Sequence, residues 1–289
     1  MNQLTPIESG AFSAGAALSK ADFQAIADIL YKEARITLAP HKITLVRSRL
    51  SRRLRERGLK TFGEYIAFIR RDVNERRIMI DSLTTNHTNF FREKHHFDHL
   101  VNEMMPEWRA RPAREPVRIW SSASSSGEEV YSIAMSMLGR DAREGQWARQ
   151  AQVQLLATDI STNMVAAVRA AVYPKSSIDH IPAPYRRLWT KPHPDGFQIA
   201  DDARNLVQPT QLNLFDRWPM RHQFDAIFCR NVMIYFNEET KIELENRLID
   251  QLVPGGALYI GHSERLMGKG RDIMVPCGHT MYRKPETAK

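Results

Sequence analysis

The sequence predicts an α/β protein in which a mostly parallel, doubly wound sheet follows a small all-helical domain. Residues 20–83 show only helical periodicity, with no strand-like run among them. From Val117 onward, short apolar runs typical of buried strands alternate with amphipathic helical segments, which is the pattern of β-α-β units. A pair of strand-like segments within about residues 184–212 predicts a small antiparallel insert in this second part.

Length and composition are those of a globular protein. The chain has 289 residues, 43% hydrophobic and 26% charged, and no apolar run is long enough to cross a membrane. Residues 1–18 lack the basic start and apolar centre of a signal peptide, so we expect a flexible leader there. Cys229 and Cys277 form neither a disulfide framework nor a metal-binding pattern, which favours buried thiols in a reducing cytoplasm.

Positive charge is concentrated in one segment. The whole chain has a net charge of +8, and residues 31–77 hold 14 Lys and Arg against five Asp and Glu. A basic segment beside a nearly neutral body predicts an acidic partner, either a nucleic acid, a membrane surface or an acidic protein.

The helical domain is predicted to span residues 19–83. Ser19 is a suitable N-cap for its first helix, and the second helix follows Pro40 and ends at Gly58. Residues 61–69 and 74–83 supply two more helices. The second helix is apolar on one face, and its other face carries Arg49, Arg52, Arg53 and Arg57. This arginine face is either a solvated surface or a docking surface, and the scarcity of acidic residues beside it favours docking.

Residues 84–99, TTNHTNFFREKHHFDH, form a polar and aromatic linker to the second domain, residues 100–289. The linker places His95, His96 and His99 close together on a helix. No Glu or Cys completes a known ligand spacing with them, so we predict no metal site and expect surface or packing histidines.

Strands and helices follow in order along the second domain. Residues 117–120, 153–157 and 224–230 are predicted as buried strands, and residues 257–261 as another strand after a turn at 254–256. Helices are predicted at 162–171 and 238–252, whereas the proline-rich residues 173–194 are expected to be irregular. Residues 196–200 and 207–212 are predicted to pair around a turn at 201–205, and a last strand lies within 279–285.

The segment VRIWSSASSSGEEVYSI (117–133) has the pattern of a strand, a small-residue loop and a helix start. Such a unit binds nucleotide-type cofactors because the backbone can approach the ligand closely. The loop has a single glycine, Gly127, and Glu128 and Glu129 place negative charge where a phosphate would bind. It therefore suits S-adenosylmethionine (AdoMet), with its sulfonium and ribose, better than a dinucleotide. The alternative is a strand and a capped helix whose glutamates complement the helix dipole.

The carboxyl ends of the other strands supply further polar residues. Ligands bind at these ends in a doubly wound sheet, and the sequence places Asp159, Asn213, Arg230 and Asn231 there. An acid at the end of the second strand is the usual partner of ribose hydroxyls, and Asp159 has that place. It indicates nucleoside binding without identifying the reaction. The alternative is that Asp159 caps the following helix.

Together these segments resemble the chemotaxis-receptor methyltransferases, the CheR family. The resemblance rests on TTNHTNFFRE (84–93), WSSASSSGEEVYSIAM (120–135), LLATDIS (155–161), FDAIFCRNVMIYF (224–236) and GGALYIGHSE (255–264), in family order over about residues 20–285. It implies an N-terminal helical domain, a Rossmann-like AdoMet methyltransferase domain and a small inserted antiparallel β-subdomain. It also implies methyl-ester formation on glutamates of the cytoplasmic helices of transmembrane chemoreceptors, with S-adenosylhomocysteine as product and no metal.

The resemblance further implies a set of AdoMet contacts: Asn86, Thr88, Arg92, Glu129, Asp159, Asn213, Leu214, Arg230 and Asn231. A glutamate carboxylate is already ionised at neutral pH, so the transfer needs alignment and no general base. Arg92 is the first candidate for positioning the substrate carboxylate or closing over the cofactor, and Tyr235 is the second. The alternatives are a linker arginine that pairs with Glu93 and a packing tyrosine.

Partners are also predicted from the resemblance. The arginine face is expected to dock a glutamate-rich receptor helix, so Arg53→Glu should weaken receptor methylation and spare AdoMet affinity. Some family members bind a receptor tether peptide through the β-subdomain. Here the loop before the first subdomain strand, TKPHPDG (190–196), is short and contains proline, which favours a tether-independent enzyme. We expect a cytoplasmic monomer that neither inserts into a membrane nor binds nucleic acid.

Three other functions fit parts of the sequence. A nucleic-acid methyltransferase would explain the basic domain, but RNVMIY lacks an NPPY-type run and no basic stretch is interleaved with aromatic residues. The intact polar set argues against a non-catalytic AdoMet-binding scaffold. The single-glycine loop and its two glutamates argue against an NAD oxidoreductase.

Overall fold

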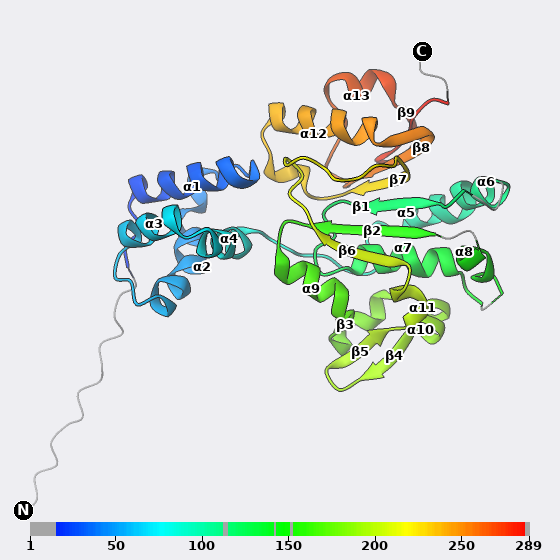
Figure 1. Cartoon of the computed structure of the whole chain (residues 1–289), viewed down its shortest axis with the longest axis horizontal. Helices are drawn as coiled ribbons and strands as arrows, with labels where there is room; N and C mark the ends of the chain where they lie inside the picture. Colours follow the sequence, from blue (N-terminus) through cyan, green and yellow to red (C-terminus); the bar gives the residue numbers. More distant parts are fainter. Residues whose placement is uncertain (1–15, 112–114, 142, 151–152, 287–289) are drawn as a thin grey trace, which may run out of the picture. The chain divides into compact units, whose positions relative to one another are not determined.

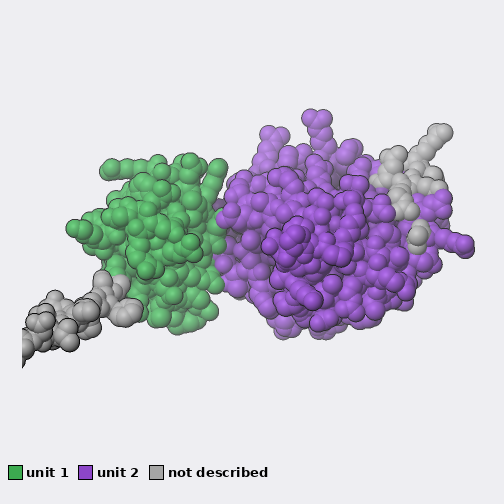
Figure 2. All heavy atoms as spheres, turned by 90° about the horizontal axis from the view of Figure 1, so that it is seen from below, with its two compact units in different colours: residues 1–30, 38–83 green, residues 31–37, 84–289 purple. Residues whose placement is uncertain are grey.

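The computed structural model describes residues 16–111, 115–141, 143–150 and 153–286, so most of the predicted leader lies outside the described residues. The chain divides into two compact units, residues 1–30 with 38–83 and residues 31–37 with 84–289 (Figures 1 and 2). No helix among the described residues has both the length and the apolar character needed to cross a membrane.

The first unit is helical, as predicted. Its helices are α1 (Lys20–Ala34), whose last turn belongs to the second unit, α2 (Ile43–Glu56), α3 (Phe62–Arg71) and α4 (Val73–Leu83), with a 3₁₀ turn η1 (Pro40–Lys42) before α2. The Ser19 hydroxyl accepts the N–H of Asp22 at 3.0 Å, which confirms the predicted cap. Thr61 and Glu64 form a capping box that starts α3. The apolar face of α2 is buried through Val46, Leu50 and Leu54.

A buried carboxylate organises the charges of this unit. Glu75 of α4 is fully buried, and its Oε2 lies 2.7 Å from Nη2 of both Arg53 and Arg57, while Tyr65 donates to its Oε1 at 3.1 Å. Burial alone would raise the pKa of Glu75, but the hydrogen bonds from the two arginines outweigh burial and lower it. Arg49 of the predicted arginine face also contacts α4, since its Nη1 donates to the Leu83 carbonyl at 2.9 Å. Three of the four arginines therefore have partners on α4, whereas the Arg52 side chain is 79% exposed.

The second unit is built on a seven-stranded sheet in the order β6-β2-β1-β7-β8-β10-β9 (Figure 1). The strands are β1 (Arg118–Ser121), β2 (Gln154–Asp159), β6 (Val207–Gln211), β7 (Phe224–Cys229), β8 (Leu252–Ile260), β9 (Val275–Gly278) and β10 (Met281–Arg283). The pairs from β6 to β8 are parallel, and β10 and β9 add antiparallel pairs at one edge. The predicted mostly parallel, doubly wound sheet is thus confirmed.

Helices cover both faces of this sheet, and successive strand residues alternate between two apolar cores. Ile119 packs on the side of α7 (Glu128–Leu138), whereas Trp120 packs on the side of α12 (Glu238–Asp250). The same alternation separates Phe228 from Ile227 in β7. Outside the small antiparallel sheet and its helices, the unit also contains α5 (Lys94–His99), η2 (Leu100–Met104), α6 (Met105–Arg109), α8 (Gln146–Gln150), α9 (Thr162–Ala170), η4 (Met233–Tyr235) and α13 (Gly268–Ile273).

The small antiparallel sheet exists, but its predicted strand pairing is wrong. It has the order β3-β5-β4, from β3 (Val172–Tyr173), β4 (Thr190–His193) and β5 (Gly196–Ile199). Residues 207–211 instead form β6, which adds in parallel to the open edge of β2. The segment between β5 and β6 is a short helix, α11 (Asp201–Arg204), rather than a turn. TKPHPDG is strand β4 and the turn into β5, with His193 opposite Gly196.

Two further predictions need correction. Residues 173–194 are not wholly irregular, because they hold η3 (Lys175–His180) and α10 (Ala183–Trp189) as well as β4. Residues 254–256 do not form a separate turn but lie inside β8, which pairs with β7 through a register shift at Phe224 and Ala226. The predicted last strand is β10.

Candidate functional site

The predicted site residues of the second unit gather where the parallel strands end. Strands β1, β2, β6, β7 and β8 run in one direction and end at Ser121, Asp159, Gln211, Cys229 and Ile260. The residues that follow these ends therefore lie along one edge of the sheet, as expected for a ligand site in this topology.

The serine-rich loop after β1 is tied to the strands on either side of it. Ser122 donates its N–H to the Phe228 carbonyl at 2.9 Å, and Ser124 donates to the Thr158 carbonyl at 2.8 Å. The N–H of Ser125 donates to the Asp159 carboxylate at 2.9 Å. Neighbouring strands thus hold the loop in one shape at the sheet edge.

Gly127 is required by packing as well as by backbone conformation. Its φ of 102° is left-handed, and it precedes α7 as the N-cap. A Cβ at this position would lie 2.8 Å from the Tyr173 hydroxyl, which donates to the Ser126 carbonyl at 2.8 Å. The loop therefore packs directly on strand β3 of the small sheet.

The two loop glutamates have different surroundings. Glu129 accepts a hydrogen bond from the Ser121 hydroxyl at 2.8 Å and pairs with Nη1 of Arg230 at 2.8 Å. Glu128 is buried, accepts from the Ser126 hydroxyl at 2.6 Å, and has its pKa raised by burial. Only Glu129 is thus linked to the cationic residue that follows β7.

Arg230 joins the linker to the strand ends. Its side chain is 2% exposed, and its Nη2 donates to the Arg92 carbonyl at 2.5 Å and lies 3.3 Å from Oε2 of Glu93. Its Nε is buried and has no hydrogen-bond partner among the described residues. A buried guanidinium between two acids, with one donor left over, is suited to hold a polar ligand at this edge.

Asp159 bridges the loop and the end of β2. One carboxylate oxygen accepts the Ser125 N–H and the other accepts the Ser161 N–H, both at 2.9 Å. The cap of α9 is the Ser161 hydroxyl, which accepts from Met164, so the alternative interpretation of Asp159 as that cap is wrong. A carboxylate has about four acceptor positions, so these bonds are compatible with ribose hydroxyls as further donors.

The linker residues reach the same edge. The Asn86 carbonyl accepts from the Ser125 hydroxyl at 3.1 Å, and the Tyr235 hydroxyl donates to the Thr85 carbonyl at 3.4 Å. Nη1 of Arg92 donates to the His87 carbonyl at 3.2 Å. The Arg92 Nε lies 3.9 Å from the Glu93 carboxylate, a long contact for the pairing considered as its alternative role. Thr88 is half-buried in the same segment.

The predicted residues after β6 and β7 differ in how they are held. The Asn213 side chain donates to the Glu33 carbonyl at 2.7 Å and accepts from the Phe215 N–H at 3.1 Å. Asn231 has a left-handed φ of 58° directly after Arg230. Leu214 is buried in the core on the α12 side of the sheet. The side chains of Asn213 and Leu214 are thus fixed after the end of β6.

The sequence analysis missed Glu264, which fixes the loop after β7. Its carboxylate accepts the N–H groups of Gly261 at 2.6 Å, Asn231 at 3.1 Å and Ile234 at 3.3 Å. Burial raises its pKa, and these hydrogen bonds offset part of that rise. A Cβ on Gly261 would lie 2.4 Å from Nδ2 of Asn231. Because Glu264 follows the end of β8, the strand-end rule could have found it.

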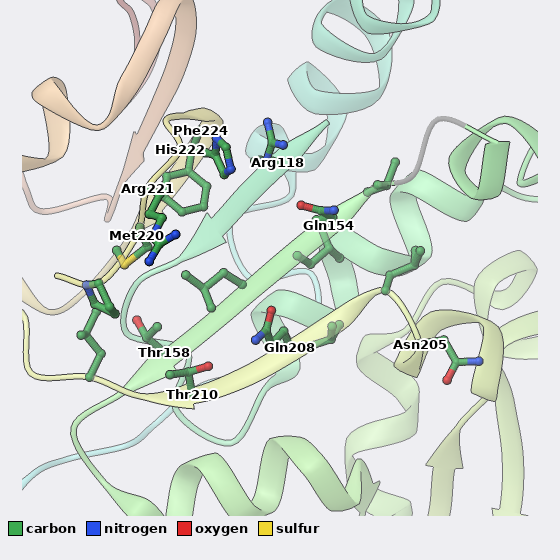
Figure 3. A pocket seen from close by; sticks show the side chains of 17 residues that line it. Arg118, Gln154, Thr158, Asn205, Gln208, Thr210, Met220, Arg221, His222 and Phe224 are labelled. Carbon is green, nitrogen blue, oxygen red and sulfur yellow. The ribbon is translucent and has the colours of Figure 1, made fainter. Parts of the chain in front are cut away.

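A separate cavity of about 480 Å³ opens on the sheet itself (Figure 3). Residues of β1, β2 and β6 line it, including Arg118, Gln154 and Gln208, together with the segment around Arg221 and His222. Residues 212–223, which connect β6 to β7, contain no helix, so this part of the sheet face is open. None of the predicted AdoMet residues lines this cavity.

Comparison with known proteins identifies two matching family models. The model "CheR methyltransferase, SAM binding domain" matches residues 86–282, and "CheR methyltransferase, all-alpha domain" matches residues 21–84. A probable chemotaxis protein methyltransferase of Rhizobium etli is 40% identical over 88% of this chain and 96% of its own length. Chemotaxis protein methyltransferase 2 of Pseudomonas aeruginosa is 37% identical, over 91% and 93%. The chemotaxis protein methyltransferase of Escherichia coli is also 37% identical, over 92% and 91%.

Proposed function

Because the chain belongs to the CheR methyltransferase family, we propose that this AdoMet-dependent methyltransferase esterifies glutamate side chains on the cytoplasmic helices of chemoreceptors. One observation carries the proposal: both domains match the family, and chemotaxis methyltransferases align over nearly the whole chain. The strand-end site supports it, since Glu129, Asp159 and Arg230 stand where a nucleoside ligand binds in this fold.

The proposed reaction requires the protein to align the carboxylate oxygen, the methyl carbon and the sulfur. An ionised glutamate oxygen forms a bond to the methyl carbon while the carbon–sulfur bond breaks, and the electron pair stays on sulfur. This leaves a methyl ester and the neutral thioether of S-adenosylhomocysteine, and no proton has to move. A carboxylate is ionised at neutral pH, so a base would add nothing, whereas holding the reacting atoms in line lowers the barrier.

Arg92 and Tyr235 are the residues we assign to the substrate carboxylate. Arg92 is 28% exposed, and only one of its guanidinium nitrogens has a hydrogen bond shorter than 3.5 Å among the described contacts. The Tyr235 hydroxyl has a long bond to Thr85. Both groups can therefore turn to an incoming carboxylate, and we assign them positioning rather than tight binding, which would stabilise the ground state.

Receptor docking is assigned to the exposed part of the arginine face. Arg53→Glu would place a carboxylate beside buried Glu75 and destabilise the first unit, so it cannot test docking alone. Arg52→Glu changes a side chain that is 79% exposed and contacts Glu56 on its own helix. We expect Arg52→Glu to raise the KM for receptor and leave AdoMet affinity unchanged. Arg71→Glu, an exposed change on α3, is the matched control.

We also propose a cytoplasmic enzyme that works without a receptor tether. Strand β4 is an edge strand of the small sheet, and Pro192 within it has no N–H to donate to an added strand. Titration with a receptor C-terminal peptide should show no saturable binding at micromolar concentration. Tight binding would overturn tether independence and leave the methyl-transfer proposal intact.

The decisive experiment measures the product. The protein is incubated with AdoMet carrying a tritiated methyl group and with receptor-rich membranes, and the label is then treated with mild alkali. We expect label on the receptor that alkali releases as methanol, because esters hydrolyse under conditions that spare N-methyl groups. Alkali-resistant label, label on added nucleic acid, or no transfer would overturn the proposed function.

A further inference from the structure

A cluster of side chains able to bind a metal lies next to Arg230, and none of its members is among the residues assigned to AdoMet. Glu93, His95 and His96 each offer one ligand atom, and these atoms all lie within 4.8 Å of one another. They come together because Glu93 has a left-handed φ of 59° at the N-cap of α5, directly before the two histidines. The sequence spacing alone did not reveal this convergence.

Hydrogen bonds fix which nitrogen of each histidine carries its lone pair. Nε2 of His95 lies 3.1 Å from the His279 carbonyl, so this nitrogen carries the hydrogen. The Thr280 hydroxyl donates to the same carbonyl at 2.7 Å. It therefore accepts from Nε2 of His96, 3.0 Å away. When each ring binds through a lone pair, that lone pair is therefore on Nδ1.

The hydrogen-bond acceptors at Nε2 of His95 and His96 are of the kind that support metal-bound histidines. A ligating histidine almost always donates its other N–H to a carbonyl, carboxylate or similar acceptor, which sets the ring orientation. Here the His279 carbonyl and the Thr280 hydroxyl supply that support from the segment between β9 and β10. The rings are thus oriented before any ion arrives.

Among the facing atoms, Nδ1 of His96 has no donor within the part of the chain that the structure describes. Both carboxylate oxygens of Glu93 and Nδ1 of His96 are buried without a hydrogen-bond partner among the described residues. The Glu93 side chain is 10% exposed, and His96 is fully buried. Arg230 lies 3.3 Å from Glu93 and balances part of its charge, but it does not satisfy the histidine lone pair. Leaving the buried Nδ1 of His96 without a donor is costly, and a bound cation removes that cost.

The separations suit a small tetrahedral ion. Nδ1 of His96 lies 3.7 Å from Oε2 of Glu93, and Nδ1 of His262 lies 3.4 Å from Oε1. Bonds of about 2.0–2.1 Å in a tetrahedral zinc site separate neighbouring ligand atoms by about 3.3 Å. The ligand atoms of Glu93, His95 and His96 all lie within 4.8 Å of one another, so closing the site shortens no separation among them by more than about 1.5 Å. His262 is 61% exposed, so it can complete the site from the surface.

We propose that Glu93, His95 and His96 bind a divalent transition metal ion, with Zn²⁺ as the best match and His262 as the fourth ligand. Two or three imidazoles and one carboxylate form a donor set that favours zinc over magnesium or calcium, which prefer oxygen ligands. The ion has no part in the methyl transfer described above.

The test uses untagged, full-length protein treated with EDTA and then dialysed free of it. Titration calorimetry with ZnCl₂ should show one saturable site per chain. Co²⁺ should give the visible absorption of a tetrahedral ion. His95→Ala should lower zinc affinity about tenfold or more, because losing a ligand costs at least as much as losing a group that supports one. His262→Ala should lower it less. His193→Ala, in β4, is the control and should bind zinc as the wild type does.

Melting curves in EDTA and AdoMet binding establish that each variant is folded. If His95→Ala does not fold, the exposed His262→Ala decides the question, because it removes a proposed ligand without opening the core. Absence of saturable zinc binding by the wild type, or equal affinity in the ligand variants and His193→Ala, would overturn the metal site. Neither result bears on methyl transfer, which the alkali-release assay measures separately.

Discussion

Glu245 is a buried carboxyl group on α12 whose charge opposes folding, and its neutral replacement should stabilise the protein at alkaline pH. The residue is 1% exposed; its Oε2 accepts the Met267 N–H at 2.8 Å, and its Oε1 has no partner among the described residues. Burial raises the pKa of Glu245 from 4.5 to about 7, and the hydrogen bond from Met267 and the charge of Lys241 offset only part of that rise.

The direction of the pH effect follows from this raised pKa. The folded state binds the proton more tightly than the unfolded state, so Glu245 does not destabilise the protein below about pH 4.5 and does so increasingly as pH rises through about 7. A rise from 4.5 to about 7, at about 1.4 kcal/mol per unit, gives a cost of up to about 3 kcal/mol at alkaline pH. Glu245→Gln keeps the acceptor for Met267 and removes the charge.

Urea unfolding followed by tryptophan fluorescence reports on the second compact unit, which contains Glu245, because all five tryptophans lie in residues 84–289. We expect Glu245→Gln to raise the free energy of unfolding by about 2–3 kcal/mol near pH 8.5 and to change it little near pH 5. Glu243→Gln, at an exposed position on the same helix, should have no comparable effect. A gain that is equal at both pH values, or a loss near pH 8.5, would refute the reasoning.

Two further predictions concern side chains that the sequence analysis missed. Glu264→Ala and Gly261→Ala should each displace Asn231. The first removes the carboxylate that accepts the Asn231 N–H, and the second places a Cβ 2.4 Å from the Asn231 side chain. Both should weaken AdoMet binding about tenfold or more in calorimetry, and unchanged affinity in both would show that Glu264 does not position this loop. Glu75→Gln should destabilise the first unit by about 3 kcal/mol, since it leaves Arg53 without its buried partner; helical circular dichroism during unfolding measures this, and a loss under about 1 kcal/mol would contradict it.

The helices of the first unit could be predicted because their signals are local. Ser19 and Thr61 cap helices within three residues of themselves, and the apolar spacing of α2 shows directly which face is buried. The partner of Arg53 could not be predicted, because Glu75 lies 22 residues away on another helix and the pairing depends on how α2 and α4 pack. Charge counting identified a basic surface and missed the acid buried beneath it.

The wrong prediction that residues 196–200 pair with residues 207–212 has a similar cause. Residues 196–199 and 207–211 are close in sequence and both suit strands, so a hairpin was the local prediction. The structure pairs Val207 with Leu155 instead, because the open edge of β2 offers a longer parallel partner. Proline at 209 is tolerated there, since β6 is itself an edge strand. Competition between distant partners is not visible in either segment alone.

The strand-end rule predicted more of the site than local patterns did. It placed Asp159 and Arg230 at one edge of the sheet, and the structure brings both to that edge. It did not show that Arg230 would lie between Glu93 and Glu129, because Glu93 precedes the sheet in sequence and reaches Arg230 only through the fold. Contacts between the linker and the strand ends are therefore the part of such a site that strand order alone does not predict.

The glycine-poor loop after β1 can now be explained by where its N–H groups point. Ser122, Ser124 and Ser125 donate to neighbouring strands, and Gly127 donates to the Ser124 carbonyl at 3.0 Å. A loop that binds pyrophosphate must leave such donors turned toward the ligand. Here they are used inside the protein, and the carboxylate of Glu129 adds negative charge beside them. The loop is therefore unsuited to a dinucleotide, which agrees with the proposal that the acids at the strand ends face the hydroxyls and positive charge of AdoMet.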